Sequence, residues 1–286
     1  MPCMSGRTAL TRDIRTRTAG LLSSAARRLS DLAVRAGGSP AGGAESGEPP
    51  VTGRSEEPVP STARATGPEA SPGPGYSRYS AAWQPSSPLE ARRLITVIDD
   101  EEYFERTGQE EAERLLPWVR PDSTVLDLGC GMGRVARYVA PHCRLLWAVD
   151  LSEPMLSLAA ERLEGLDNVR FARSGDTGVP SVPAASIDFL YSVLVLQHLE
   201  REDAFLLMED VARMLRPGAS AFVTWPNITE PFYLDGFVTY AHNGEAANPS
   251  RARMYTTIEL ETVLPLAGFS RVEVHDAPNI VTICTR

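Results

Sequence analysis

The sequence predicts an α/β fold with a doubly wound, mostly parallel sheet of about seven strands. Predicted strands and helices alternate from residue 125 onward, which is typical of a parallel sheet with helices on both faces. An apolar stretch at 125–128 leads through a loop of small residues into a helical pattern at 134–140. The segment Leu145–Asp150 is apolar up to its last residue, as expected of a strand buried on both faces. A chain of 286 residues is long enough for one such domain.

Two segments of different composition precede the predicted domain. Residues 1–36 are basic and contain apolar residues near helical spacing, so we expect an extension that is partly helical. A targeting peptide or a membrane-surface helix is the alternative for this segment. Residues 37–90 are rich in Gly, Pro, Ser, Ala and Glu and have few large aliphatic residues, which predicts a disordered linker. The folded domain is therefore expected at residues 91–286.

Local patterns set the elements within that domain. Residues Asp99–Glu102 can cap and charge the start of a helix whose apolar face includes Tyr103 and Phe104. Ser152 is a favourable N-cap for the helix after the second strand. The segment 226–253 breaks the periodicity. The remaining predicted strands span 168–172, 187–196, 219–225, 271–275 and 280–284, and the remaining helices span 204–215 and 254–269.

Charge, cysteine and histidine content argue against several classes of protein. A formal net charge of −9 disfavours a basic face for nucleic acid. No apolar run approaches the roughly 20 residues of a membrane span. The four cysteines have no C-x-x-C spacing, which favours reduced thiols and a cytoplasmic location. None of the four histidines lies at metal-ligand spacing from another His or Cys, so no metal site is expected.

The loop after the first predicted strand is the main candidate for a ligand-binding site. Gly129, Gly131 and Gly133 lack a Cβ atom, so a ligand can approach the backbone there, although a tight turn alone has the same composition. A dinucleotide loop of the form G-x-G-x-x-G would need glycine where Arg134 stands. Asp127 precedes the loop, and together these features resemble the motif D-x-G-x-G-x-G of class I S-adenosylmethionine-dependent methyltransferases. A carboxylate suits the positive amine and sulfonium of that cofactor.

The resemblance implies further cofactor-binding residues. Asp150 ends the second strand, where the family has an acid that accepts from both ribose hydroxyls, although a position beside a helix cap is the alternative. Met155 resembles the apolar residue that packs on adenine. Gly175 and Asp176 resemble the loop that accepts from the adenine amino group, although an ordinary turn has the same residues. The residues expected to bind S-adenosylmethionine are Asp127, Gly129, Gly131, Gly133, Asp150, Met155, Asp176, Thr177 and Ser192.

A second group of residues is expected to face the acceptor. His198 follows the strand at 187–196, and with a pKa near neutrality it is a candidate general base, or else a residue that orients a loop. Tyr103 and Phe104 are expected to close the site, or simply to pack in the core. Tyr233 and His242 fit an acceptor pocket, with a surface loop or a subunit contact as the alternative.

The sequence therefore predicts transfer of a methyl group from S-adenosylmethionine to an O, N or C nucleophile of a small organic acceptor. The main alternative is a non-catalytic protein that binds S-adenosylmethionine as a scaffold or regulator. A nicotinamide oxidoreductase is a third possibility, which Arg134 and Asp127 disfavour. No nucleic-acid partner and no integral membrane segment are expected, and the oligomeric state stays open.

Overall fold

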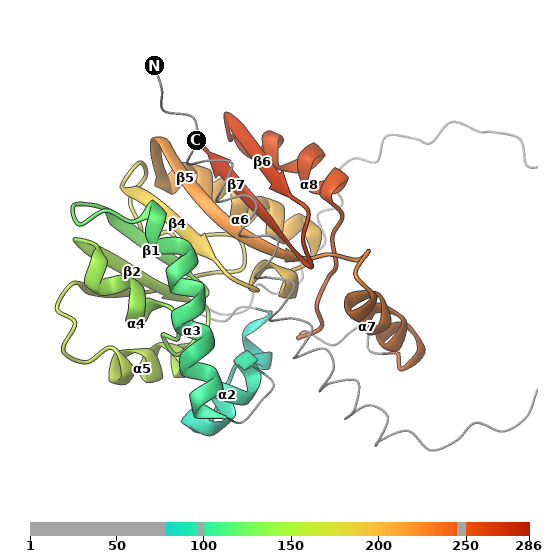
Figure 1. The fold of residues 1–286 in the computed structure, drawn as a ribbon, viewed down its shortest axis with the longest axis horizontal. Helices are drawn as coiled ribbons and strands as arrows, with labels where there is room; N and C mark the ends of the chain where they lie inside the picture. The colour runs from blue at the N-terminus through green and yellow to red at the C-terminus, as the bar shows by residue number, and fades with distance from the viewer. Residues whose placement is uncertain (1–77, 97–99, 245–249) are drawn as a thin grey trace, which may run out of the picture.

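The computed structural model describes residues 78–96, 100–244 and 250–286, which form a seven-stranded sheet flanked by helices (Figure 1). The strand order is β3-β2-β1-β4-β5-β7-β6. The strands are β1 Thr124–Leu128, β2 Leu145–Asp150, β3 Val169–Arg173, β4 Ile187–Ser192, β5 Leu215–Pro226, β6 Arg271–His275 and β7 Asn279–Thr285.

Strands β1 to β5 pair in parallel with one another, and β7 is antiparallel to both β5 and β6. The predicted doubly wound sheet with a terminal antiparallel hairpin is therefore confirmed. The direction of winding reverses between the neighbouring strands β1 and β4. At such a switch point the loops that leave the two strands run to opposite faces and leave space for a ligand at the carboxyl edge of the sheet.

Helices α3, α4 and α5 cover one face of the sheet, and α6 and α8 cover the other (Figure 1). The helices are α2 Pro88–Thr96, α3 Glu101–Leu115, α4 Ala136–Val139, α5 Glu153–Arg162, α6 Arg201–Met214, α7 Pro231–His242 and α8 Thr257–Val263. Short 3₁₀ turns are η1 Ser80–Ala82, η2 Leu116–Trp118, η3 Ala140–His142, η4 Leu196–His198 and η6 Leu264–Ala267. In the part of the chain that the structure describes, no helix has both the length and the apolarity needed to cross a membrane.

Successive side chains of the central strand β1 point to opposite faces of the sheet and pack in different core clusters. Val125 packs in one cluster with Leu115 of α3 and Leu156 of α5. Its neighbour Leu126 points to the other face and packs in a cluster with Met208 of α6. Burying one such side chain contributes about 1.5–3 kcal/mol. Strand β1 is therefore packed on both faces, which fixes the position of the loop that follows its carboxyl end.

Side-chain caps define the starts of three helices. Asp100 accepts from the Tyr103 backbone N–H at 2.9 Å and begins α3. Ser152 accepts from the Met155 N–H at 3.2 Å and begins α5, as predicted. Thr256 caps α8 in the same way. A cap of this kind satisfies an N–H group that has no partner within the helix and is worth about 1 kcal/mol.

Part of the predicted linker is folded, so its expected end at residue 90 lies too late in the chain. Tyr79 is only 3% exposed, and its hydroxyl accepts from the Glu200 N–H at 3.0 Å and donates to Asp203. Helix α2 then begins at Pro88. The linker was predicted from the average composition of residues 37–90, which does not reveal single buried residues such as Tyr79. The predicted extension at 1–36 and the linker at 37–77 lie outside the described residues.

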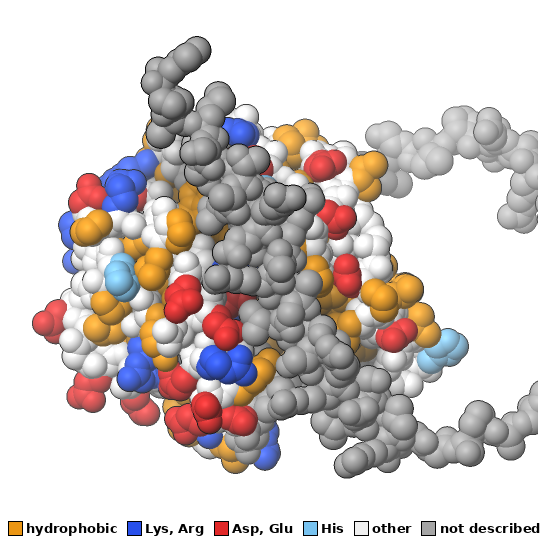
Figure 2. Space-filling model, in the orientation of Figure 1, with side chains coloured by type: hydrophobic (Ala, Val, Ile, Leu, Met, Phe, Trp, Pro, Cys, Tyr) orange, Lys and Arg blue, Asp and Glu red, His pale blue; other side chains and the backbone are white. Residues whose placement is uncertain are grey.

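Helix α7 occupies a segment whose sequence showed no periodicity. Its apolar residues lie on all sides of the helix, so they follow no helical period. Phe232, Leu234 and Phe237 are 39%, 45% and 50% exposed, whereas Tyr233 is buried. Figure 2 shows hydrophobic side chains gathered over α7, at the right of the view. The helix therefore contacts the domain through a narrow strip and presents an apolar outer surface.

Candidate active site

The loop after β1 lies against the end of β2 at the switch point. The backbone N–H groups of Gly129 and Cys130 both donate to the Val149 carbonyl, at 2.7 and 2.9 Å. The next N–H, from Gly131, donates to Oδ2 of Asp150 at 2.8 Å. These bonds bring the predicted loop and the predicted ribose-binding acid together at the carboxyl edge of the sheet.

The loop exposes bare backbone because its glycines adopt conformations that side chains disfavour. Gly129, Gly131 and Gly133 have φ angles of 82°, 53° and 82°. A Cβ atom at Gly129 would lie 2.3 Å from Cγ2 of Val195, and one at Gly131 would lie 2.9 Å from Cδ1 of Ile95. Val195 and Ile95 can therefore approach the loop closely only because these two positions are glycines.

Asp150 is held by two backbone donors. Its Oδ1 accepts from the Ser152 N–H at 2.9 Å, while Oδ2 accepts from Gly131. Burial raises the pKa of Asp150, and the backbone N–H groups of Ser152, Gly131 and Leu151 oppose that shift. A carboxylate offers about four acceptor positions, so capacity remains for two further donors such as a pair of hydroxyls.

Asp127 carries a buried acceptor without a partner. The side chain is 4% exposed, and Oδ2 accepts no hydrogen bond from the described residues. Burial raises the pKa of Asp127 to about 7, and the charge of Asp150 acts in the same direction, while the charge of Arg134 and the nearby Tyr191 hydroxyl, which does not meet hydrogen-bond geometry, oppose it. An unpaired buried carboxylate is costly, so this position favours a ligand that brings a positively charged donor.

The remaining residues expected at the cofactor have different surroundings. Met155 is 1% exposed and packs in a small apolar cluster, and Thr177 is exposed. Asp176 accepts from the Arg78 N–H at 3.4 Å. The buried hydroxyl of Ser192 donates to the carbonyl of a β1 residue at 2.9 Å, so it joins the ends of β4 and β1.

His198 is fixed in one tautomer by its hydrogen bonds. Nδ1 lies 2.9 Å from the Ser250 carbonyl, which only accepts, so Nδ1 carries the proton. Nε2 is then unprotonated and accepts from the Gln197 side-chain amide at 3.0 Å. Burial lowers the pKa of His198 to about 4, and the charge of Arg253 also lowers it. The expected pKa near neutrality is therefore wrong, since the ring is desolvated and stays uncharged at neutral pH.

Comparisons with known proteins agree with this geometry. A family model described as a methyltransferase domain matches residues 125–218. The chain is 27% identical over 183 residues to a probable S-adenosylmethionine-dependent methyltransferase of Mycolicibacterium smegmatis, with 64% of this chain and 65% of that protein covered. It is 32% identical over 123 residues to phosphoethanolamine N-methyltransferase 2 of Caenorhabditis elegans, with 42% and 28% covered. These matches show a methyltransferase domain over residues 125–218 and support a class I S-adenosylmethionine-dependent methyltransferase.

The comparison with solved structures agrees with the observed fold. A solved structure of phosphoethanolamine N-methyltransferase 2 from Haemonchus contortus, in complex with phosphomonomethylethanolamine and S-adenosylhomocysteine, matches with a TM-score of 0.54 and 20% identity. The match covers 70% of this chain and 46% of that one. The chain thus spans less than two thirds of the length of these methyltransferase relatives.

The four residues expected to face the acceptor are not gathered in one place in this methyltransferase domain. Phe104 is fully buried and packs in the same cluster as Met155. Tyr103 is half-buried, with the guanidinium of Arg106 5.3 Å from its ring. Tyr233 donates its hydroxyl to Asn279, and His242 is exposed at the far end of α7.

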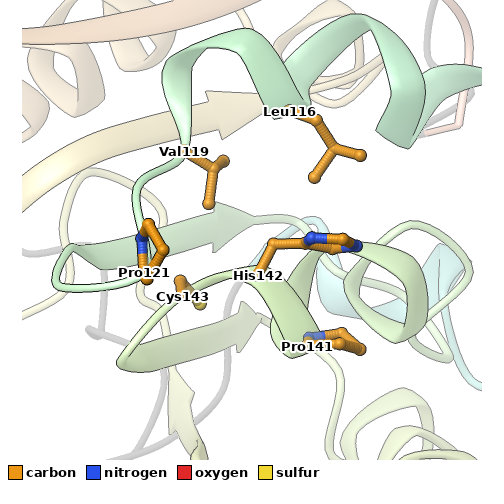
Figure 3. A pocket seen from close by; sticks show the side chains of 6 residues that line it. All are labelled: Leu116, Val119, Pro121, Pro141, His142 and Cys143. Atoms are coloured by element: carbon orange, nitrogen blue, oxygen red, sulfur yellow. The ribbon is translucent and has the colours of Figure 1, made fainter.

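Two apolar side chains of the chain itself lie close to the glycines of the candidate site. Val195 lies against Gly129 and Ile95 lies against Gly131. The pocket in Figure 3 is elsewhere, because residues preceding β1 and β2 line it and place it at the opposite, amino edge of the sheet. It encloses about 240 Å³ and is lined by Leu116, Val119, Pro121, Pro141, His142 and Cys143. Ile95 and Trp83 were not expected at the site. Trp83, which contacts His198, precedes the predicted domain start at residue 91, and Ile95 lies just after it.

Gly129→Ala should lower the free energy of unfolding by about 2–4 kcal/mol, since the new Cβ meets Val195 at a positive φ. Gly165→Ala is the matched control, because Gly165 has a φ of 85° but no atom within 4 Å of the Cβ position. Chemical denaturation of both variants separates backbone strain from steric overlap. Equal losses of stability would contradict the close approach at Gly129.

Proposed function

We propose that this protein transfers a methyl group from S-adenosylmethionine to an oxygen, nitrogen or carbon atom of a small organic acceptor. The observation that carries the proposal is the bare glycine loop at the switch point with the buried carboxylates of Asp127 and Asp150 beside it. The phosphoethanolamine methyltransferase relative acts on a small molecule, which supports an acceptor of that class. The unpaired buried cysteines Cys130, Cys143 and Cys284 support a cytoplasmic location.

The chain supplies groups that fit each part of this cofactor. The partnerless Oδ2 of Asp127 suits the ammonium of the methionine end, and the glycine loop leaves its backbone open to that end. The spare acceptor positions of Asp150 suit the ribose hydroxyls. Met155, with Asp176 and Thr177, forms the proposed adenine side, and Ser192 lies at the methionine end. The bound cofactor supplies a methyl group already activated on sulfonium, so the protein mainly aligns the acceptor and excludes water.

His198 is the proposed general base. Its Nε2 lone pair is available at neutral pH because Nδ1 is committed to the Ser250 carbonyl. An acceptor hydroxyl or amine that replaces the Gln197 amide at Nε2 can pass its proton to that nitrogen. Bonding of Nδ1 to a carbonyl keeps the ring in the required tautomer and orientation. Tyr103, Phe104, Tyr233 and His242 stay proposed contacts of the acceptor, each from its own place in the fold, because the described structure does not bring them together.

Calorimetry of the full-length protein with S-adenosylhomocysteine tests the cofactor assignment. We expect saturable heat with one ligand per chain. Incubation with S-adenosylmethionine and extracts containing candidate acceptors, followed by mass spectrometry, should then reveal a compound that has gained one methyl group. Binding without any methyl transfer would favour the scaffold or regulator. No heat with either the cofactor or its demethylated product would overturn the proposal.

A further inference from the structure

Trp83, which lies between η1 and α2, contacts the proposed base directly. Its ring centroid lies 4.7 Å from that of His198, with an angle of 65° between the rings. This is an edge-to-face arrangement, which aromatic pairs favour and which is worth about 0.5–1.5 kcal/mol beyond the buried area. The contact brings a residue of the predicted linker to the centre of the candidate active site.

The backbone of Trp83 is tied to the cofactor side of the site. Its carbonyl accepts from the Ser152 hydroxyl, and Ser152 is fully buried and follows Asp150 by two residues. The Trp83 side chain also packs against the apolar cluster that contains Met132 and Met155. One residue thus links the turn beside the proposed ribose acid, the proposed adenine side and the imidazole.

Arg253 and the groups paired with it lie next to His198. Arg253 donates from Nη1 to the His198 carbonyl at 2.7 Å and pairs with Glu200. Arg251 also pairs with Glu200, at 3.5 Å. Because one carboxylate serves two guanidinium groups, the local charge is positive and disfavours a protonated imidazole. Trp83 adds an apolar aromatic contact to the same ring.

We propose that Trp83 is a positioning residue that acts through His198. The indole edge holds the imidazole against the Ser250 carbonyl and keeps water away from the ring, so that Nε2 presents a lone pair to the acceptor. The hydrogen bond from the Ser152 hydroxyl to the Trp83 carbonyl ties the position of the indole to the turn that carries Asp150. The inference rests on the proposed function only in treating His198 as the base.

An NMR titration of the imidazole resonances of the full-length protein tests this role without an acceptor. The chain has only four histidines, and a His198→Gln variant assigns the resonance. The wild-type midpoint is expected at about 4. In Trp83→Ala, water reaches the ring and the midpoint should rise toward 6.5, while Trp83→Phe should keep it low. Ser152→Ala, which removes the anchor on Trp83 together with the side-chain cap of α5, should raise the midpoint by a smaller amount.

Trp118→Ala is the matched control, since Trp118 stacks on Phe189 at 6.0 Å near the opposite edge of the sheet. It should leave the His198 midpoint unchanged. With an acceptor in hand, Trp83→Ala should lower kcat roughly tenfold while the KM for the cofactor changes little. An unchanged midpoint in both Trp83→Ala and Ser152→Ala would overturn the inference. Failure of wild-type protein to bind S-adenosylhomocysteine would instead overturn the proposed function and leave the titration result standing.

Discussion

Asp127→Asn is expected to stabilise the ligand-free protein at pH 8 while removing most of its affinity for S-adenosylhomocysteine. The ionised Asp127 carboxylate is buried with Oδ2 unpaired, and its pKa is raised from 3.8 to about 7. The folded protein therefore binds a proton between those pH values that the unfolded chain releases, so this group lowers stability as the pH rises through that range. Asparagine removes the buried charge, and we expect a gain of about 2 kcal/mol at pH 8.

Thermal unfolding at pH 8 and at pH 4, with calorimetry on the same samples, measures both effects. The melting temperature should rise by roughly 4–8 °C at pH 8 and by little at pH 4. Asp188→Asn is the control, because Asp188 accepts from the Thr124 N–H at 2.8 Å and pairs with Arg216. That variant loses satisfied interactions and should lose stability. A stability loss in Asp127→Asn, or retained ligand affinity, would contradict the role assigned to Asp127.

His198→Gln should lower kcat by about 100-fold or more and leave the affinity for S-adenosylhomocysteine within a factor of about two. Glutamine cannot take up the acceptor's proton, but it keeps a polar side chain of similar reach. In the wild type the uncharged imidazole is the active form, and its pKa is about 4. The kcat should therefore stay constant from about pH 6 upward and fall as the pH drops through 4.

Single-turnover kinetics across that pH range check the assignment. His142→Gln is the control, since His142 is exposed and lines the pocket at the amino edge of the sheet. It should leave kcat and its pH dependence unchanged. Wild-type-like turnover in His198→Gln would exclude the imidazole as the base, whatever its surroundings.

The parts of the fold that depend on neighbouring residues could be predicted from the sequence. The strand Leu145–Asp150 has the predicted bounds, and Ser152 and Thr256 cap the expected helices. These features follow from short patterns of burial and capping. Helix α7 was missed because its apolar residues follow no period.

The parts that depend on distant segments could not be predicted. The pKa of His198 depends on burial of the ring and on Ser250 and Arg253, which lie 52 or more positions away from it. The sequence placed His198 after the correct strand but carried no information on what would cover the ring. Tyr79 and Trp83 likewise stand singly in a segment whose average composition is that of a linker.

The apolar side chains of Ile95 and Val195 that rest on the glycine loop have a consequence for ligand selection. A molecule that reaches the loop competes with hydrocarbon instead of water, and must offer enough favourable contacts to displace two side chains at once. We therefore expect weak binding of small polar molecules that contact only one part of the loop. Selectivity at this edge of the sheet then depends on the free energy needed to displace the Ile95 and Val195 side chains, as well as on the contacts that the bound ligand makes.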